Sequence, residues 1–260
     1  MLVSDIANPW FGQLAGLVER ALRQHGYSLL ICDTAEDPKI EAHYLRLLRE
    51  RDIDGMILVP VLRTRQTLSR LVRPRFPLVL LDRPITGVAA SVATDQDQAA
   101  GLLCETLSRA GVRRIALVSG PRDIVTHRRR AQITSRRFKV VDTYEGPAQK
   151  ETGRRAFIRF ALRHADAVVC TNNFLGQGVI DAMEEIDNPP IIGCFDELPT
   201  MHLLPLPIVC VMQDVPLLAD GCVRQLLPQL RGEKARLSPI LLPARAVTNR
   251  AFQRRQSAPF

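Results

Sequence analysis

Short apolar runs alternate with amphipathic segments along almost the whole chain. The runs lack polar alternation, as in residues 56–60 (Met-Ile-Leu-Val-Pro) and 78–82 (Leu-Val-Leu-Leu-Asp), which is typical of strands buried on both faces. The segments between the runs place apolar residues three and four positions apart, as helices that cover a sheet do. This alternation predicts an α/β fold built on parallel sheets.

The opening stretch, residues 3–12, predicts the end of a buried strand, a turn and the start of a helix. Asn8 is suited to cap that helix with its side-chain oxygen, and Pro9 fits the first helical position. Apolar residues then follow at helical spacing until Gly26 ends the pattern. Trp10 and Phe11 are therefore expected where a strand meets a helix, the end of an open α/β sheet at which ligands bind.

The same reasoning assigns elements to most of the remaining chain. Further strands are expected at residues 28–32, 56–60, 78–82, 91–93, 114–119, 140–144, 167–170, 191–194, 208–211, 237–242 and 244–248. Further helices are expected at residues 39–51, 64–72, 96–110, 151–163, 173–185 and 215–230. The basic segment 128–139 gives no clear periodicity, so we expect residues 128–137 to be mobile without a ligand.

The strand–helix pattern restarts near residue 96, which predicts two doubly wound lobes. We expect residues 1–96 with about 214–242 to form one lobe, and residues 97–213 with about 243–260 to form the other. Two such lobes, joined by several crossings of the chain, create a ligand cleft between facing strand ends.

Composition narrows the class of protein. The 260 residues are 46% hydrophobic with a net charge of +8, which is compatible with an anionic ligand or nucleic acid but not specific for either. The six cysteines form no CxxC pair and mostly lie in apolar runs, as reduced buried thiols do. No metal-ligand spacing, catalytic motif or nucleotide loop occurs, and the five histidines are expected in surface-like positions. We expect no metal, no cofactor and no enzymatic activity.

Several short motifs follow one another in a specific order. They lie at residues 5–11, 26–27, 53–58, 81–83, 92–95, 115–121, 167–173 and 192–197 and around Gln213. Through them the chain resembles the effector-binding core of LacI-family transcription regulators, itself similar to periplasmic sugar-binding proteins. The resemblance implies the fold of type I periplasmic binding proteins. Residues 174–181 and the short region after Arg130 are most similar to the fructose-responsive catabolite repressor/activator branch.

The resemblance implies the core of a cytoplasmic transcription regulator, either a repressor or an activator, that binds a small sugar or sugar phosphate. It implies a homodimer whose interface includes residues 39–51 and 64–72. Regulators of this kind bind DNA through an N-terminal helix-turn-helix, and nothing before Met1 supplies one, so we do not expect this chain alone to bind an operator specifically. No signal peptide opens the chain and no apolar run is long enough to span a membrane, which opposes the alternative of a transporter's solute-binding protein. An enzyme on the same fold is a third reading.

The candidate ligand-binding residues follow from strand ends and from the resemblance. They are Trp10, Phe11, Asp82, Arg83, Thr126, Arg130, Asn172, Asp196 and Gln213. Trp10 is suited to stack on a sugar, and the two arginines are suited to hold an anionic effector together. Five of them have a structural alternative: core packing for the aromatic pair, an internal contact for Arg83, helix capping for Asn172 and bracing of the hinge for Gln213.

The chain also departs from the family in two places. Residues 130–134 (Arg-Ala-Gln-Ile-Thr) stand where the family has an Arg-x-x-Gly-Phe helix start, and Ala148 replaces an aromatic residue that often lines the cleft. Both departures concern the expected second lobe. They bear on which ligand the chain accepts.

Overall fold

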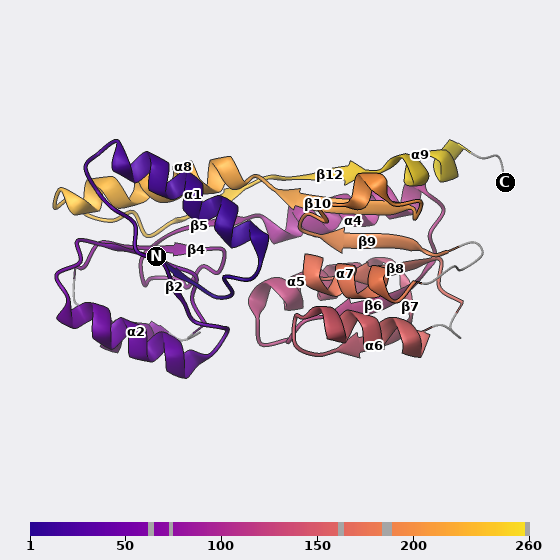
Figure 1. Ribbon diagram of the computed structural model, residues 1–260, viewed down its shortest axis with the longest axis horizontal. Helices are drawn as coiled ribbons and strands as arrows, with labels where there is room; N and C mark the ends of the chain where they lie inside the picture. The colour runs from indigo at the N-terminus through magenta and orange to yellow at the C-terminus, as the bar shows by residue number, and fades with distance from the viewer. Residues whose placement is uncertain (62–64, 73–74, 161–163, 184–188, 258–260) are drawn as a thin grey trace. The chain divides into compact units, whose positions relative to one another are not determined.

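A computed structural model describes residues 1–61, 65–72, 75–160, 164–183 and 189–257. The chain divides into two compact units. Unit 1 comprises Met1–Thr94 and Asp214–Leu242, and unit 2 comprises Asp95–Gln213 and Pro243–Phe260. The chain therefore passes from one unit to the other three times, at residues 94–95, 213–214 and 242–243. Each unit is an α/β fold, as predicted (Figure 1).

Unit 1 contains a parallel sheet with the strand order β11-β5-β4-β3-β1-β2. The strands are β1 (Leu2–Val3), β2 (Cys32–Asp33), β3 (Met56–Leu58), β4 (Leu78–Leu81), β5 (Ala90–Thr94) and β11 (Pro239–Leu242). The helices are α1 (Pro9–Arg23), α2 (Pro38–Glu50), α3 (Arg65–Leu71) and α8 (Val215–Leu230). Asn8 caps α1 and Pro9 is its first residue, as the opening stretch predicted.

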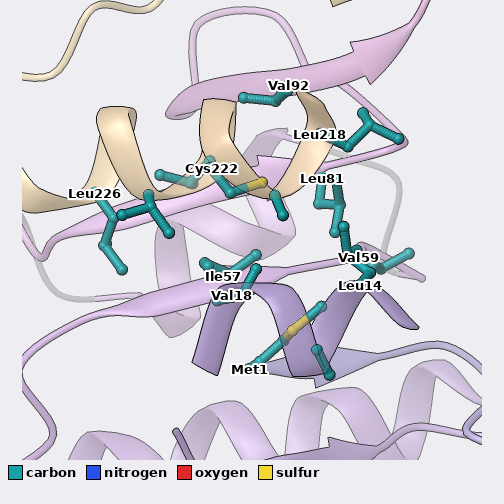
Figure 2. Close-up of a cluster of buried hydrophobic side chains, with 14 of the residues drawn as sticks. Met1, Leu14, Val18, Ile57, Val59, Leu81, Val92, Leu218, Cys222 and Leu226 are labelled. Carbon is teal, nitrogen blue, oxygen red and sulfur yellow. The ribbon is translucent and has the colours of Figure 1, made fainter. Parts of the chain in front are cut away.

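Two helices distant in sequence, α1 and α8, cover one face of this sheet. Figure 2 shows Val18 of α1 and Cys222 of α8 beside strand residues such as Ile57 and Val92. These side chains are buried, so the apolar stripe of each helix and the continuous apolar strands remove one another from water. A second cluster, which includes Leu45 of α2, packs on the other strand side chains.

Unit 2 repeats this strand order as β12-β10-β9-β8-β6-β7, with β12 antiparallel to β10. Its strands are β6 (Arg114–Ser119), β7 (Lys139–Glu145), β8 (Ala167–Cys170), β9 (Ile191–Phe195), β10 (Ile208–Gln213) and β12 (Ala244–Thr248). Its helices are α4 (Gln96–Arg109), α5 (Val125–Arg137), α6 (Lys150–Phe160), α7 (Asn173–Asp181), the short 3-10 helix η1 (Met201–Leu203) and α9 (Arg250–Ser257). The matching order makes β4 of unit 1 equivalent to β9 of unit 2.

Helices α6 and α7 approach each other at backbone distance on one face of the second sheet. A Cβ added to Gly178 of α7 would lie 1.8 Å from the carbonyl oxygen of Lys150 in α6. The reverse holds for Gly153 of α6, whose added Cβ would lie 2.1 Å from the carbonyl oxygen of Leu175 in α7. Only glycine at both positions permits this crossing, which buries the apolar faces of both helices over the sheet.

The structure corrects several local predictions. The strand predicted at 28–32 is reduced to Cys32–Asp33, because only these residues pair with β1, and Leu30 is 67% exposed. The basic segment forms most of α5, where Arg130 and Thr134 are buried, so the premise that little packing holds it was wrong. Helix α9 was not predicted. The predicted ends of three helices, at residues 64, 161–163 and 184–185, lie outside the described residues.

Candidate functional site

The two equivalent strands β4 and β9 end in the same local structure. Asp82 follows β4 with φ 66°, and Asp196 follows β9 with φ 67°. Each amide donates a hydrogen bond to the neighbouring strand, Asp82 to the carbonyl of Val92 and Asp196 to that of Val211, both at 2.9 Å. A left-handed conformation is unusual for a residue with a side chain, so both strand ends hold a strained aspartate at the carboxyl edge of a sheet.

In unit 1, Arg83 lies beside Asp82 with its side chain only 10% exposed. Its guanidinium donates to both carboxylate oxygens of Glu36, at 2.9 and 2.5 Å. Weaker contacts at 3.4 Å reach the hydroxyl of Ser4 and the carbonyl of Pro60. Burial acts to lower the pKa of Arg83, but the hydrogen bonds and charge of Glu36 outweigh it and raise that pKa, so the guanidinium stays charged.

The two aromatic residues of unit 1, Trp10 and Phe11, differ in their burial. Phe11 is buried in the cluster between α1, α8 and the sheet, which is the packing alternative weighed for it. Trp10 is half-buried and meets Phe11 edge to face, with ring centroids 4.7 Å apart. Within the described part of the chain, the buried indole nitrogen of Trp10 has no hydrogen-bond partner.

In unit 2, Arg130 of α5 is buried in a network of polar groups. Its Nη1 donates to Asp196 at 3.0 Å and to the carbonyl of Thr171 at 2.9 Å, and its Nε donates to Gln96 at 2.7 Å. The guanidinium carbon lies 4.7 Å from the ring centroid of Phe195. The buried face of α5 is therefore polar, and Asp196 balances the positive charge of Arg130 on that face.

Gln213 joins this network from the end of β10, where its amide nitrogen donates to the second oxygen of Asp196 at 2.7 Å. The side chain of Asn172 caps α7 by accepting from the amide of Leu175 at 3.0 Å, so the capping alternative describes it. Thr126 is buried in the first turn of α5. The structure therefore gathers Arg130, Asp196 and Gln213 directly.

His127 contradicts the prediction that all histidines occupy surface-like positions. It is buried, and its Nδ1 lies 2.8 Å from the hydroxyl of Thr171. Its ring fills the space against Gly120, where an added Cβ would lie 2.6 Å from the ring. Because α5 has little apolar periodicity, its hydropathy pattern does not indicate which of its faces is buried.

The arrangement favours a ligand rich in hydroxyl groups. Within the described residues, Trp10, Arg83 and Gln96 each have a buried donor with no hydrogen-bond partner: Nε1, Nε and Nε2, respectively. A carboxylate lies beside the arginine in each unit, Asp82 beside Arg83 and Asp196 beside Arg130, and a hydroxyl both donates and accepts. Glu36 and Gln96 were not among the predicted site residues, because their roles depend on partners that lie far away in sequence.

A cavity of about 430 Å³ lies elsewhere in unit 1, at the amino-terminal ends of β1 and β3. Its lining includes Tyr27, Leu48, Asp54 and Leu230 and contains none of the predicted site residues. In the described residues, no helix combines the length and apolar character needed to cross a membrane.

Comparison with known proteins identifies the family of this chain. Residues 1–188 match the family described as periplasmic binding proteins and sugar binding domain of LacI family. The ribose operon repressor of Halalkalibacterium halodurans is 27% identical over 248 residues, which cover 88% of this chain and 72% of that protein.

Two solved structures share the fold. Cra, a transcriptional dual regulator from Pseudomonas putida in complex with fructose 1-phosphate, superposes with a TM-score of 0.87 at 22% identity, over 95% of this chain and 96% of that one. A putative ribose operon repressor from Burkholderia thailandensis superposes with a TM-score of 0.82 at 26% identity, over 95% and 97%. The match over most of the chain shows that it belongs to the family of periplasmic binding proteins and LacI-type sugar-binding domains.

Proposed function

We propose that this chain is the effector-binding and dimerisation core of a cytoplasmic LacI-type transcription regulator, with a small sugar or sugar phosphate as its effector. The observation that carries the proposal is the buried cluster of Arg130, Asp196 and Gln213 at the carboxyl edge of the second sheet. Fixed donors and acceptors of this kind recognise a polyol through several hydrogen bonds at once. The relatives named as sugar-operon repressors support a regulatory role.

The direct test is calorimetric titration of the protein with sugars and their phosphates. Arg130→Ala is expected to weaken the bound compound by roughly tenfold to a hundredfold, since a hydrogen bond to a charged group contributes about 1.5–3 kcal/mol. Arg128→Ala is the matched control, because Arg128 is exposed on the same helix and its guanidinium donates to the carbonyl of Arg122. Equal losses in both variants, or no binding by the wild type to any compound, would contradict the proposal.

The oligomeric state and the DNA partner are part of the same proposal. A homodimer with α2 and α3 in its interface would give a regulator the two-fold axis that paired DNA half-sites require. We propose that operator binding belongs to a helix-turn-helix outside these 260 residues. The fructose-responsive branch stays a prediction, because the Cra structure at 22% identity shows the fold alone.

A further inference from the structure

We propose that Glu36 is a specificity-determining residue, which makes the strand end at Arg83 accept uncharged sugars and reject phosphorylated ones. The inference rests on the proposed function, since it concerns the charge of the effector at that site. It reverses the sequence-based expectation that Arg83 and Arg130 select an anion.

The first argument is how the fold positions Glu36. Ala35 and Glu36 have φ of 50° and 55°, so two consecutive residues with side chains adopt the left-handed conformation after β2. Backbone hydrogen bonds hold this turn against β1: Thr34 donates to the carbonyl of Val3 at 2.9 Å, and Glu36 donates to that of Ser4 at 2.7 Å. Because surrounding hydrogen bonds maintain this unfavourable backbone conformation, the side chain that it orients, Glu36, is a candidate for a functional role.

The second argument concerns the hydrogen bonds that the guanidinium of Arg83 already makes. Both terminal nitrogens face Glu36 in the two-pronged arrangement that a phosphate group would otherwise take. The remaining nitrogen, Nε, lies 3.6 Å from a carboxylate oxygen of Asp82 and has no hydrogen-bond partner among the described residues. A phosphate would have to displace Glu36, whereas a sugar hydroxyl needs only Nε as donor and a carboxylate as acceptor.

The third argument is the sign of the local charge. Glu36 and Asp82 both lie against Arg83, so one cation already faces two carboxylates. Burial raises the pKa of Asp5, and the negative charges of Asp33 and Glu36 raise it further. A phosphate dianion brought to this position would meet net negative charge, and limited exposure of Arg83 and Asp82 leaves that repulsion poorly screened by salt.

Unit 2 has the same balance at the equivalent strand end. Arg130 is paired with Asp196, and both side chains are almost fully buried, at 4% and 10% exposure. Asp196 also accepts from Gln213, so its two oxygens are held by one charged and one neutral donor. Neither arginine therefore offers an unbalanced positive charge, and each strand end by itself favours an uncharged ligand.

The test compares D-ribose with ribose 5-phosphate, and D-fructose with fructose 1-phosphate, by calorimetry on wild type and Glu36→Gln. The wild type is expected to bind the neutral member of a pair at least tenfold more tightly. Glu36→Gln keeps the shape but removes the charge, so the preference should shift toward the phosphate by tenfold or more. Glu19→Gln, the same change at a partly exposed position of α1, is the control and should leave the ratio unchanged.

The outcomes separate the two proposals. Tighter binding of a phosphorylated sugar by the wild type would overturn the role of Glu36 even if Glu36→Gln failed to fold. A ratio that is the same in wild type, Glu36→Gln and Glu19→Gln would overturn it too, and would leave Glu36 as a structural partner of Arg83. A wild type that binds neither these four compounds nor any other sugar or sugar phosphate of the titration series would refute the proposed function itself and this inference with it.

Discussion

Gly178→Ala is the substitution whose effect the structure specifies most closely. The new methyl group would lie 1.8 Å from the carbonyl oxygen of Lys150 and 2.7 Å from its carbon, and both atoms are backbone. No side-chain rotation can relieve this overlap. Helices α6 and α7 would have to separate by roughly 1.6 Å to restore the 3.4 Å of ordinary contact.

The magnitude follows from two opposing effects. Overpacking a tight contact costs about 1–3 kcal/mol, and a backbone obstacle places this position at the upper end. Alanine in a helix interior recovers about 1 kcal/mol relative to glycine. We expect the free energy of unfolding to fall by about 2 kcal/mol, which corresponds to a melting temperature roughly 6 °C lower for a unit of this size.

Urea unfolding followed by circular dichroism, with thermal melts alongside, measures this change. Gly101→Ala is the matched control, since Gly101 is exposed inside α4 and an added Cβ meets nothing within 4 Å. The control should gain about 1 kcal/mol from helix propensity. If Gly178→Ala were as stable as Gly101→Ala, the close helix crossing would be refuted.

Three further predictions concern buried polar groups and thiols. Asn249→Ala should lower the free energy of unfolding by about 3 kcal/mol, because its side chain bonds four backbone groups at 2.8–3.1 Å; an unchanged denaturation midpoint would contradict this. A thiol reagent should label Cys32 quickly and the five buried cysteines only on unfolding, which mass spectrometry of the native protein would check. Burial raises the pKa of Cys222 to about 12, so stability should be full below pH 9 and fall as the pH rises toward 12; Cys222→Ala should show a shallower fall in urea midpoints between pH 8 and 10.5.

Local signals predicted most of the fold. The start of α1 was predictable because Asn8 and Pro9 act within one turn of the chain. The strands were predictable because burial on both faces leaves continuous apolar runs. The same criterion wrongly predicted a strand over residues 28–32. This run is apolar, but only Cys32–Asp33 pairs with another strand, and strand pairing depends on residues distant in sequence.

The candidate site was predictable only in part. Asp82, Arg83 and Asp196 could be recognised because each directly follows an apolar strand. Glu36 could not, since its importance comes from a contact with Arg83, 47 positions later in the chain. The burial of His127 was not predicted for another reason. The buried face of α5 consists of polar residues, which hydropathy alone assigns to the surface.

The threefold passage of the chain between units has a consequence for its synthesis. β5 lies at the edge of its sheet until β11 pairs with it, and α8 must cover Val92 and the neighbouring strand residues. The 119 residues of Asp95–Gln213 are translated between these parts. At about 5–20 residues per second, a ribosome needs on the order of 10 s for that stretch. During this interval the nascent residues 1–94 present an unpaired strand edge and an apolar sheet face, the kind of surface that chaperones bind on growing chains.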